Sequence, residues 1–119
     1  MKLIDLVGKD LYDAVVEFRD DTPDYEEVVF LKKDLPAWIK ALSEKLGLPL
    51  ISTEEVETRH LSEDSTASKI DHAVDLADPY GGIGEGQTLY LGVHDFTEVL
   101  IMIWPWQDNV KVTLKKIIV

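Results

Sequence analysis

The stretch TLYLGVHDFTEVLIMIWPWQDNVKVTLKKIIV, residues 88–119, decides the fold class of this chain. It contains three runs rich in β-branched and aromatic residues: TLYLGV (88–93), EVLIMIW (98–104) and VKVTLKKIIV (110–119). Such runs favour strands, and the short connections between them favour antiparallel neighbours. The C-terminal third is therefore predicted to be an antiparallel meander of three strands.

The middle run, 98–104, is apolar on both of its faces, which is typical of a central strand covered on both sides. One face carries Val99, Ile101 and Ile103. We assign to the opposite face of the sheet Tyr90, Leu100, Met102, Trp104, Ile117 and Val119. This second face needs either a layer of helices or a second copy of the chain, so a homodimer through it is one expectation.

An amphipathic helix is predicted over residues 35–46, upstream of the sheet. Asp34 is placed to cap its first turn, Pro36 is tolerated within that turn, and Gly47 can provide the left-handed end. The apolar positions between these signals recur at helical spacing.

A second helix is predicted over residues 5–19, where apolar residues also recur at near-helical spacing. Gly8 disfavours a helix interior, so the helix could instead begin at the Asp10 cap and leave residues 2–7 extended. The polar run 19–24 contains a proline and is predicted to be a loop.

Three further segments have weaker patterns. Residues 24–33 fit a helix or a strand, and the β-branched and aromatic content of 28–31 favours the strand. Residues 65–77 show both helical and alternating periodicity, and their alanines favour a helix. Residues 48–51 fit a turn or a short edge strand. The chain is thus predicted to be α+β, with two or three amphipathic helices against an antiparallel sheet.

Length and composition predict a single domain over residues 1–119. The chain has 119 residues, of which 45% are hydrophobic and 29% charged, as in ordinary globular proteins. It has no cysteine, which excludes disulfides and thiolate chemistry. No apolar run approaches the roughly 18 residues of a membrane span, and the first residues do not have the pattern of a signal peptide. We therefore expect a cytoplasmic protein without membrane contact.

The charge balance restricts the class of partner. There are 23 acidic and 12 basic residues, giving a net charge of −11. Nucleic acid is not expected as a ligand, because phosphate binding needs a basic surface. The excess of carboxylates can serve solubility, or it can steer the protein toward a partner with a basic surface.

A divalent metal site is one hypothesis that the residue types allow, although no other cofactor is indicated. Imidazole and carboxylate groups are metal ligands, and several histidines lie beside aspartates or one helical turn from them. The candidate ligands are His60, His72, Asp75, His94 and Asp95. No established metal motif is present, so chance proximity is the competing interpretation.

The segment 80–87 contains four glycines, Gly81, Gly82, Gly84 and Gly86, and is predicted to be a flexible loop. A phosphate-binding role is disfavoured because the segment precedes a strand instead of joining a strand to a helix, and because it carries an acidic residue.

Large aromatic side chains give the second functional hint. Trp106 follows the buried run and a proline, so it is a candidate for contact with a partner. The other candidates for such contact are Tyr80, Tyr90 and Met102. No nucleophile motif is recognisable. The sequence therefore favours a non-enzymatic protein-interaction module, such as an adaptor, an inhibitor or an immunity-type protein. The alternative is a small metal- or ligand-binding domain, or an enzyme, that uses the histidines and aspartates under a glycine-rich lid.

Overall fold

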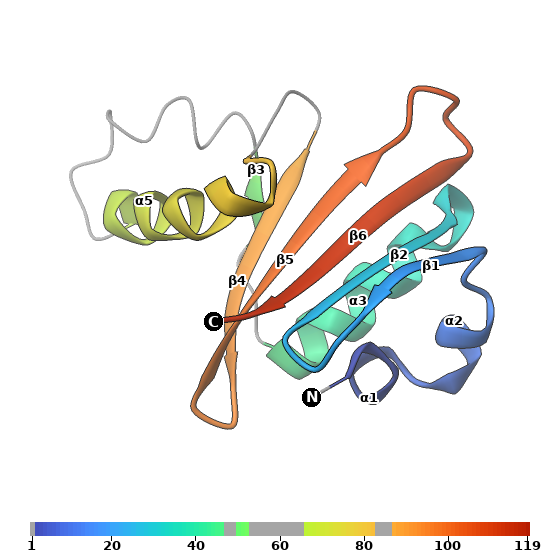
Figure 1. Cartoon of the computed structure of the whole chain (residues 1–119), viewed down its shortest axis with the longest axis horizontal. Helices are drawn as coiled ribbons and strands as arrows, with labels where there is room; N and C mark the ends of the chain where they lie inside the picture. The colour runs from blue at the N-terminus through green and yellow to red at the C-terminus, as the bar shows by residue number, and fades with distance from the viewer. Residues whose placement is uncertain (1, 47–49, 53–65, 83–86) are drawn as a thin grey trace.

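The computed structural model describes residues 2–46, 50–52, 66–82 and 87–119, and its centre is a six-stranded sheet (Figure 1). The strands are β1 (Glu17–Asp21), β2 (Tyr25–Leu31), β3 (Leu50–Ser52), β4 (Thr88–His94), β5 (Thr97–Pro105) and β6 (Lys111–Ile118). Their spatial order is β1-β2-β6-β5-β4-β3, and every neighbouring pair is antiparallel. The predicted α+β class and the C-terminal meander are confirmed.

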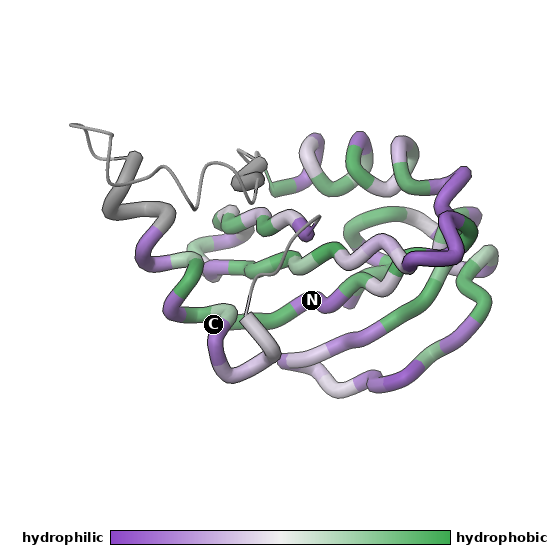
Figure 2. Tube along the Cα trace, turned by 90° about the horizontal axis from the view of Figure 1, so that it is seen from above, coloured by the Kyte–Doolittle hydropathy of each residue, from purple (hydrophilic) through white to green (hydrophobic). Residues whose placement is uncertain are grey.

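Helices lie on both faces of this sheet. The first face is covered by α1 (Leu3–Val7), α2 (Lys9–Asp13) and α3 (Leu35–Leu46), with a single turn η1 (Lys32–Asp34) leading into α3. The opposite face carries α5 (Thr66–Ala77), which ends in the turn η3 (Asp78–Tyr80). In Figure 2, seen from above, α3 forms the coil along one side of the strands. None of the described helices is both long and apolar enough to cross a membrane.

The alternation of side chains along β5 builds two separate cores. Its Val99, Ile101 and Ile103 are at most 1% exposed and pack with Trp38 and Leu42 of α3. Burial of these side chains is the main term that holds α3 on the sheet. The predicted helix 35–46 is confirmed to the residue.

The second core lies between the sheet and α5. Its members include Ala73 and Ala77 of α5 and Leu100 and Met102 of β5, which are at most 1% exposed. The predicted helix 65–77 is thus confirmed, and so is a central β5 covered twice. A layer of helices or a homodimer was expected because this face needed a cover. The helix α5 supplies that cover over β4, β5 and the end of β6.

Tyr90 was assigned to the wrong face. It pairs with Ile101 in the β4·β5 ladder and lies in the core under α3, only 2% exposed. Paired residues in neighbouring strands point to the same side of a sheet. Leu89, which pairs with Met102, therefore occupies the α5 face instead.

The helix predicted over residues 5–19 is wrong. Gly8, with φ +89°, separates the two short helices α1 and α2, and residues 17–21 form the edge strand β1. The apolar spacing was real, because Leu3 and Leu6 are buried under the sheet. A continuous helix through Gly8 would move Leu3 and Leu6 out of these buried positions. Beyond Ala14, hydrogen bonding to β2 outweighs the local preference for a helix.

The loop predicted over residues 19–24 is shorter than expected, because Arg19 to Asp21 belong to β1. The chain reverses at Thr22, whose N–H donates to the Tyr25 carbonyl at 2.8 Å and whose Oγ1 bonds the same carbonyl at 2.9 Å. The strand favoured for 28–31 is confirmed within β2, and Leu50–Ser52 is a short edge strand as one alternative had it.

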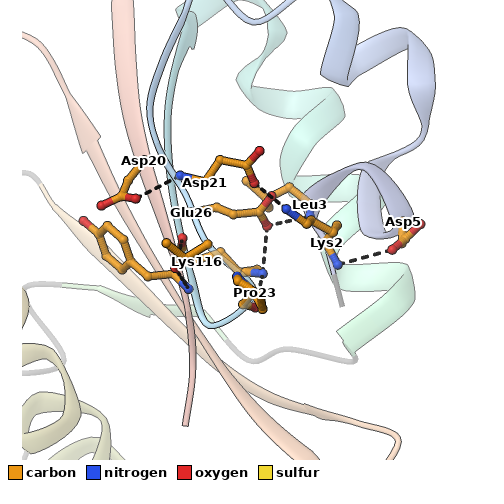
Figure 3. Close-up of polar contacts among 10 residues, drawn as sticks. Lys2, Leu3, Asp5, Asp20, Asp21, Pro23, Glu26 and Lys116 are labelled. Atoms are coloured by element: carbon orange, nitrogen blue, oxygen red, sulfur yellow. Dashed lines mark hydrogen bonds and ion pairs between the residues drawn. The ribbon is translucent and has the colours of Figure 1, made fainter.

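A buried ion pair ties the N-terminal segment to the first face of the sheet (Figure 3). Glu26 and Lys116 are opposite one another in β2 and β6, are 1% and 0% exposed, and lie 2.7 Å apart between Oε2 and Nζ. The same Glu26 oxygen accepts the Leu3 N–H at 2.7 Å, and Lys2 Nζ reaches Asp21 at 2.6 Å. These contacts hold α1 over the end of β2.

Candidate functional site

The face under α5 is only partly covered, and its open part is the candidate site. The core under α5 involves β4, β5 and the end of β6, whereas the same face continues across β6 and β2 to the edge strand β1. We call the half-buried aromatic and lysine residues on this open part, together with the exposed Arg19, the aromatic strip. Its members are Arg19, Tyr25, Tyr80, Trp104, Trp106, Lys111 and Lys115.

Strand register places these side chains on one surface. Lys115 pairs with Met102, and Tyr25 pairs with Ile117, so both point to the side of the second core. Trp104 pairs with Thr113, and Trp106 is joined to the same threonine by a hydrogen bond of 2.7 Å from its Nε1 to Oγ1. The strip therefore follows from the period of two in β2, β5 and β6.

One end of the strip is built around Lys115. The rings of Tyr25 and Tyr80 stack with centroids 5.4 Å apart and an angle of 13°. Lys115 Nζ donates to the Tyr80 carbonyl at 2.7 Å and lies 3.8 Å from the centre of the Trp104 ring. A cation over a tryptophan face is held by the ring quadrupole. This lysine therefore links η3 to β5 and β6.

The other end of the strip is built around Trp106. The Arg19 guanidinium lies 5.4 Å and the Lys111 ammonium 5.2 Å from the centre of its ring. Arg19 also approaches Glu17 at 3.4 Å and Glu27 at 3.6 Å. With the hydrogen bond to Thr113, these contacts from β1 and β6 hold the indole in place without a partner.

The strip also shifts two ionisation equilibria. Burial raises the pKa of the Tyr25 hydroxyl, and the 2.6 Å hydrogen bond from this hydroxyl to Glu27 Oε1 adds to the effect. Burial lowers the pKa of Lys115, while the carboxylate of Glu27 acts in the opposite direction. Both shifts agree with a surface that is partly withdrawn from water, although none of the α-helices in the described part of the chain covers it.

Residues of this kind are suited to protein contact. Tryptophan, tyrosine and arginine are enriched at the energetic centres of interfaces, where a large rigid side chain is desolvated by the partner. Trp104, Trp106, Tyr25 and Tyr80 are all partly exposed, so each retains surface that a partner can bury. The carboxylates of Glu17, Asp20 and Glu27 offset the charges of the strip's cations. The strip itself thus carries three cationic side chains with carboxylates at its border.

The structure brings together two of the four residues predicted to contact a partner. Trp106 and Tyr80 belong to the strip, whereas Met102 is 1% and Tyr90 2% exposed, each inside a core. Those two are not accessible to a partner in this fold. Sequence reasoning missed Tyr25, Arg19 and the two lysines. The alternation of β2 and β6 could have indicated Tyr25 and the lysines, but the position of Arg19 depends on a β1 strand that was predicted as helix and loop.

The predicted metal ligands do not form a ligand set in the part of the chain that the structure describes. His72 and Asp75 are exposed on α5, and His72 Nε2 lies 3.2 Å from both carboxylate oxygens of Glu98 on β5. His94 and Asp95 are at the β4–β5 connection, and His60 lies outside the described residues. Among residues 2–46, 50–52, 66–82 and 87–119, no three histidine, aspartate or glutamate side chains are grouped so that they could hold a metal.

The described part of the glycine-rich segment is a helix end. Gly81 has φ +108° and its N–H donates to the Asp78 carbonyl at 3.3 Å, while the Gly82 N–H donates to Ala77 at 3.0 Å. These bonds satisfy the last carbonyls of α5 and η3. Gly84 and Gly86 lie outside the described residues, so the lid hypothesis stays a prediction.

Comparison of the chain with known protein families, with curated proteins and with solved structures finds no match. The functional argument therefore depends on the geometry of the strip.

Proposed function

We propose that this protein is a non-enzymatic interaction module that binds another protein through the aromatic strip. The observation that carries the proposal is the placement of Trp106 on an uncovered sheet face, with its ring between Arg19 and Lys111. A fixed aromatic side chain loses little conformational freedom on binding, so more of its contact energy remains as affinity.

The charge distribution supports a partner with a basic surface. Residues 5–27, which form α1, α2, β1 and the first part of β2, contain nine acidic and two basic residues. Most of these carboxylates are exposed. Glu17, Asp20 and Glu27 border the strip on β1 and β2, whereas those of α1 and α2 lie over the first face. Such an acidic border raises the rate of encounter with a basic protein, while the aromatic rings of the strip supply the contact itself.

Binding through side chains is favoured over addition of a strand to β1. The β1·β2 register shifts between Phe18 and Asp20, and the Asp21 N–H donates at 2.9 Å to the Asp20 carboxylate. A bulge and a locally satisfied N–H are ways in which an edge strand is protected from pairing with another strand. The partner therefore meets the sheet face and not its edge.

The test is affinity capture from the source cells with three forms of the chain as bait. Trp106→Ala is expected to lose the partner that the wild type retains, and Val119→Ser, which changes an exposed apolar residue outside the strip, is expected to keep it. The Trp106→Ala change should cost less than about 2 kcal/mol of unfolding free energy, because the ring is only partly buried.

Two results would contradict the proposal. Retention of the partner by folded Trp106→Ala would place the contact elsewhere on the molecule. Capture that does not weaken between about 50 mM and 500 mM salt would remove the role of the acidic border.

A further inference from the structure

The connection between β4 and β5 places a phenylalanine in an unfavourable position. Asp95 and Phe96 form a two-residue turn in which both have positive φ, +50° and +64°. Glycine or asparagine usually occupies such positions, and a bulky side chain there is an outlier. Phe96 is also fully exposed, at 104% of its reference area, so its ring gains nothing from burial.

This hairpin tip is an apolar projection with acidic neighbours. Figure 1 shows the β4–β5 connection extending beyond the rest of the molecule at the bottom of the view. Val93, next to the tip, is 58% exposed. The carboxylates of Asp95 and Glu98 flank Phe96 on the two strands, and His72 of α5 contacts Glu98.

The opposite end of the sheet has a hollow of complementary character. It is open, has a volume of about 310 Å³, and is lined by Leu31, Lys32, Lys33, Asn109 and Val110. Leu31 and Val110 give it an apolar floor, and Val110 is 52% exposed. The two charged residues of the lining are both lysines.

The walls of the hollow are held by local hydrogen bonds. The Lys32 N–H donates to the Val110 carbonyl at 2.7 Å, which joins η1 to the β5–β6 connection. The Val110 N–H donates to Asp108 Oδ1 at 2.9 Å, so this nearby carboxylate is directed at the backbone. The hollow is thus formed before an occupant enters.

We infer that Phe96 of one copy of this chain enters the hollow of another copy, so that the protein associates head to tail. The ring meets Leu31 and Val110, while Asp95 and Glu98 face Lys32 and Lys33. The tip and the hollow lie at opposite ends of the nine-residue β5, about 30 Å apart, so one copy cannot satisfy both. A heterologous contact of this kind leaves a tip and a hollow free at the ends and produces open chains.

The contact is small, so the association is weak and concentration-dependent. Sedimentation velocity from about 20 μM to about 1 mM is expected to show the weight-average mass of the wild type rising above that of one chain. Phe96→Gly should remain monomeric at every concentration. Because glycine suits a positive φ, this variant should fold as well as the wild type, and its melting temperature is the check.

A mixing experiment isolates the two surfaces. Lys33→Glu combined with Val110→Ser removes the hollow, leaves the tip intact and should be monomeric alone. Mixed with Phe96→Gly, whose hollow is intact, it should form dimers that do not grow further with concentration. Val16→Ser, which alters an exposed apolar residue that belongs to neither surface, should associate as the wild type does.

Each other outcome overturns the inference. A wild type that stays monomeric at 1 mM has no such contact, and association that survives Phe96→Gly uses another surface. If the two variants fail to form dimers on mixing, the tip does not enter the hollow, and Phe96 is left to contact a different protein. The result is independent of the strip, because none of these variants changes a strip residue.

Discussion

The two faces of the sheet use tryptophan in opposite ways. Trp38 of α3 is 0% exposed on the first face and stacks on Phe30 with centroids 4.4 Å apart. Trp106 on the other face is partly exposed and lies among cations instead of aliphatic side chains. On the first face, α3 and the N-terminal segment together cover the sheet. On the second face, α5 covers only part of it.

The difference separates residues that maintain the fold from residues that are available for contact. Side chains that are sealed by apolar packing or by a buried ion pair are not accessible to a partner. A face that retains half-buried aromatic side chains has spare contact area, which is costly to leave exposed in a molecule without a partner. Substitutions on the two faces should therefore differ in stability and in binding, and four experiments test this contrast or the supports of each face.

The largest expected effect is that of Trp38→Ala. Removing a fully buried tryptophan creates a cavity between α3 and β2 and should cost about 3–5 kcal/mol of unfolding free energy. Urea denaturation followed by circular dichroism measures this, and Trp106→Ala is the matched variant on the open face. If the two substitutions cost the same, the distinction between a closed and an open face is wrong.

Lys116→Met should have a nearly equal effect on the closed face. It leaves the Glu26 carboxylate buried without its cation, which typically costs about 3–5 kcal/mol. The double variant with Glu26→Gln should recover much of this loss, because the glutamine retains an acceptor for the Leu3 N–H and carries no charge. If the unfolding free energy of Lys116→Met alone is within about 1 kcal/mol of that of the wild type, the ion pair does not stabilise the N-terminal segment.

Sequence reasoning predicted the sheet well where patterns were local. The alternation of 98–104 identified a central strand covered on both sides, and the signals around 35–46 defined α3. Both depend on neighbours in the chain, and nothing distant competes with them. The prediction for residues 5–19 failed because the apolar spacing of α1 and α2 is helical, whereas the strand β1 that follows them forms only by pairing with β2.

The candidate site was accessible to sequence reasoning only in part. Trp106 stood out as a large side chain after a proline, but one of the two cations at its ring, Arg19, comes from β1, which is distant in the sequence. The wrong face predicted for Tyr90 also results from a contact between strands that the local sequence does not show. One residue of slip moves a side chain to the opposite face, and only the cross-strand partner fixes it.

A moderate effect is expected for Gly81→Ala, which tests how the open face is supported. Gly81 has φ +108°, and a Cβ there would lie 3.2 Å from Cη2 of Trp104. Backbone strain alone should cost about 1–2 kcal/mol. Gly82→Ala is the control, since Gly82 also has a positive φ of +67° and a Cβ there would meet only Asp78 Oδ1, at an ordinary contact distance of 3.7 Å.

The difference between the two alanine variants, measured by urea denaturation, gives the cost of displacing Trp104. A larger loss for Gly81→Ala is expected, together with a change in the near-ultraviolet signal of the tryptophans. Equal losses would mean that Trp104 moves freely, and the strip would then not be fixed in advance.

The smallest expected effect concerns pH, and it tests the β5–β6 connection that joins the strip to the hollow. The Val110 N–H, followed by the Lys111 N–H, donates to Asp108 and holds the pKa of this carboxyl below its ordinary range. Because the folded pKa is lower than the unfolded one, Asp108 contributes stability above about pH 4, and this contribution is lost as the pH falls through the folded pKa. In Asp108→Asn the fall in melting temperature below about pH 4 should therefore be less steep than in the wild type. An unchanged or steeper slope for Asp108→Asn would mean that the carboxylate is not what holds this connection together.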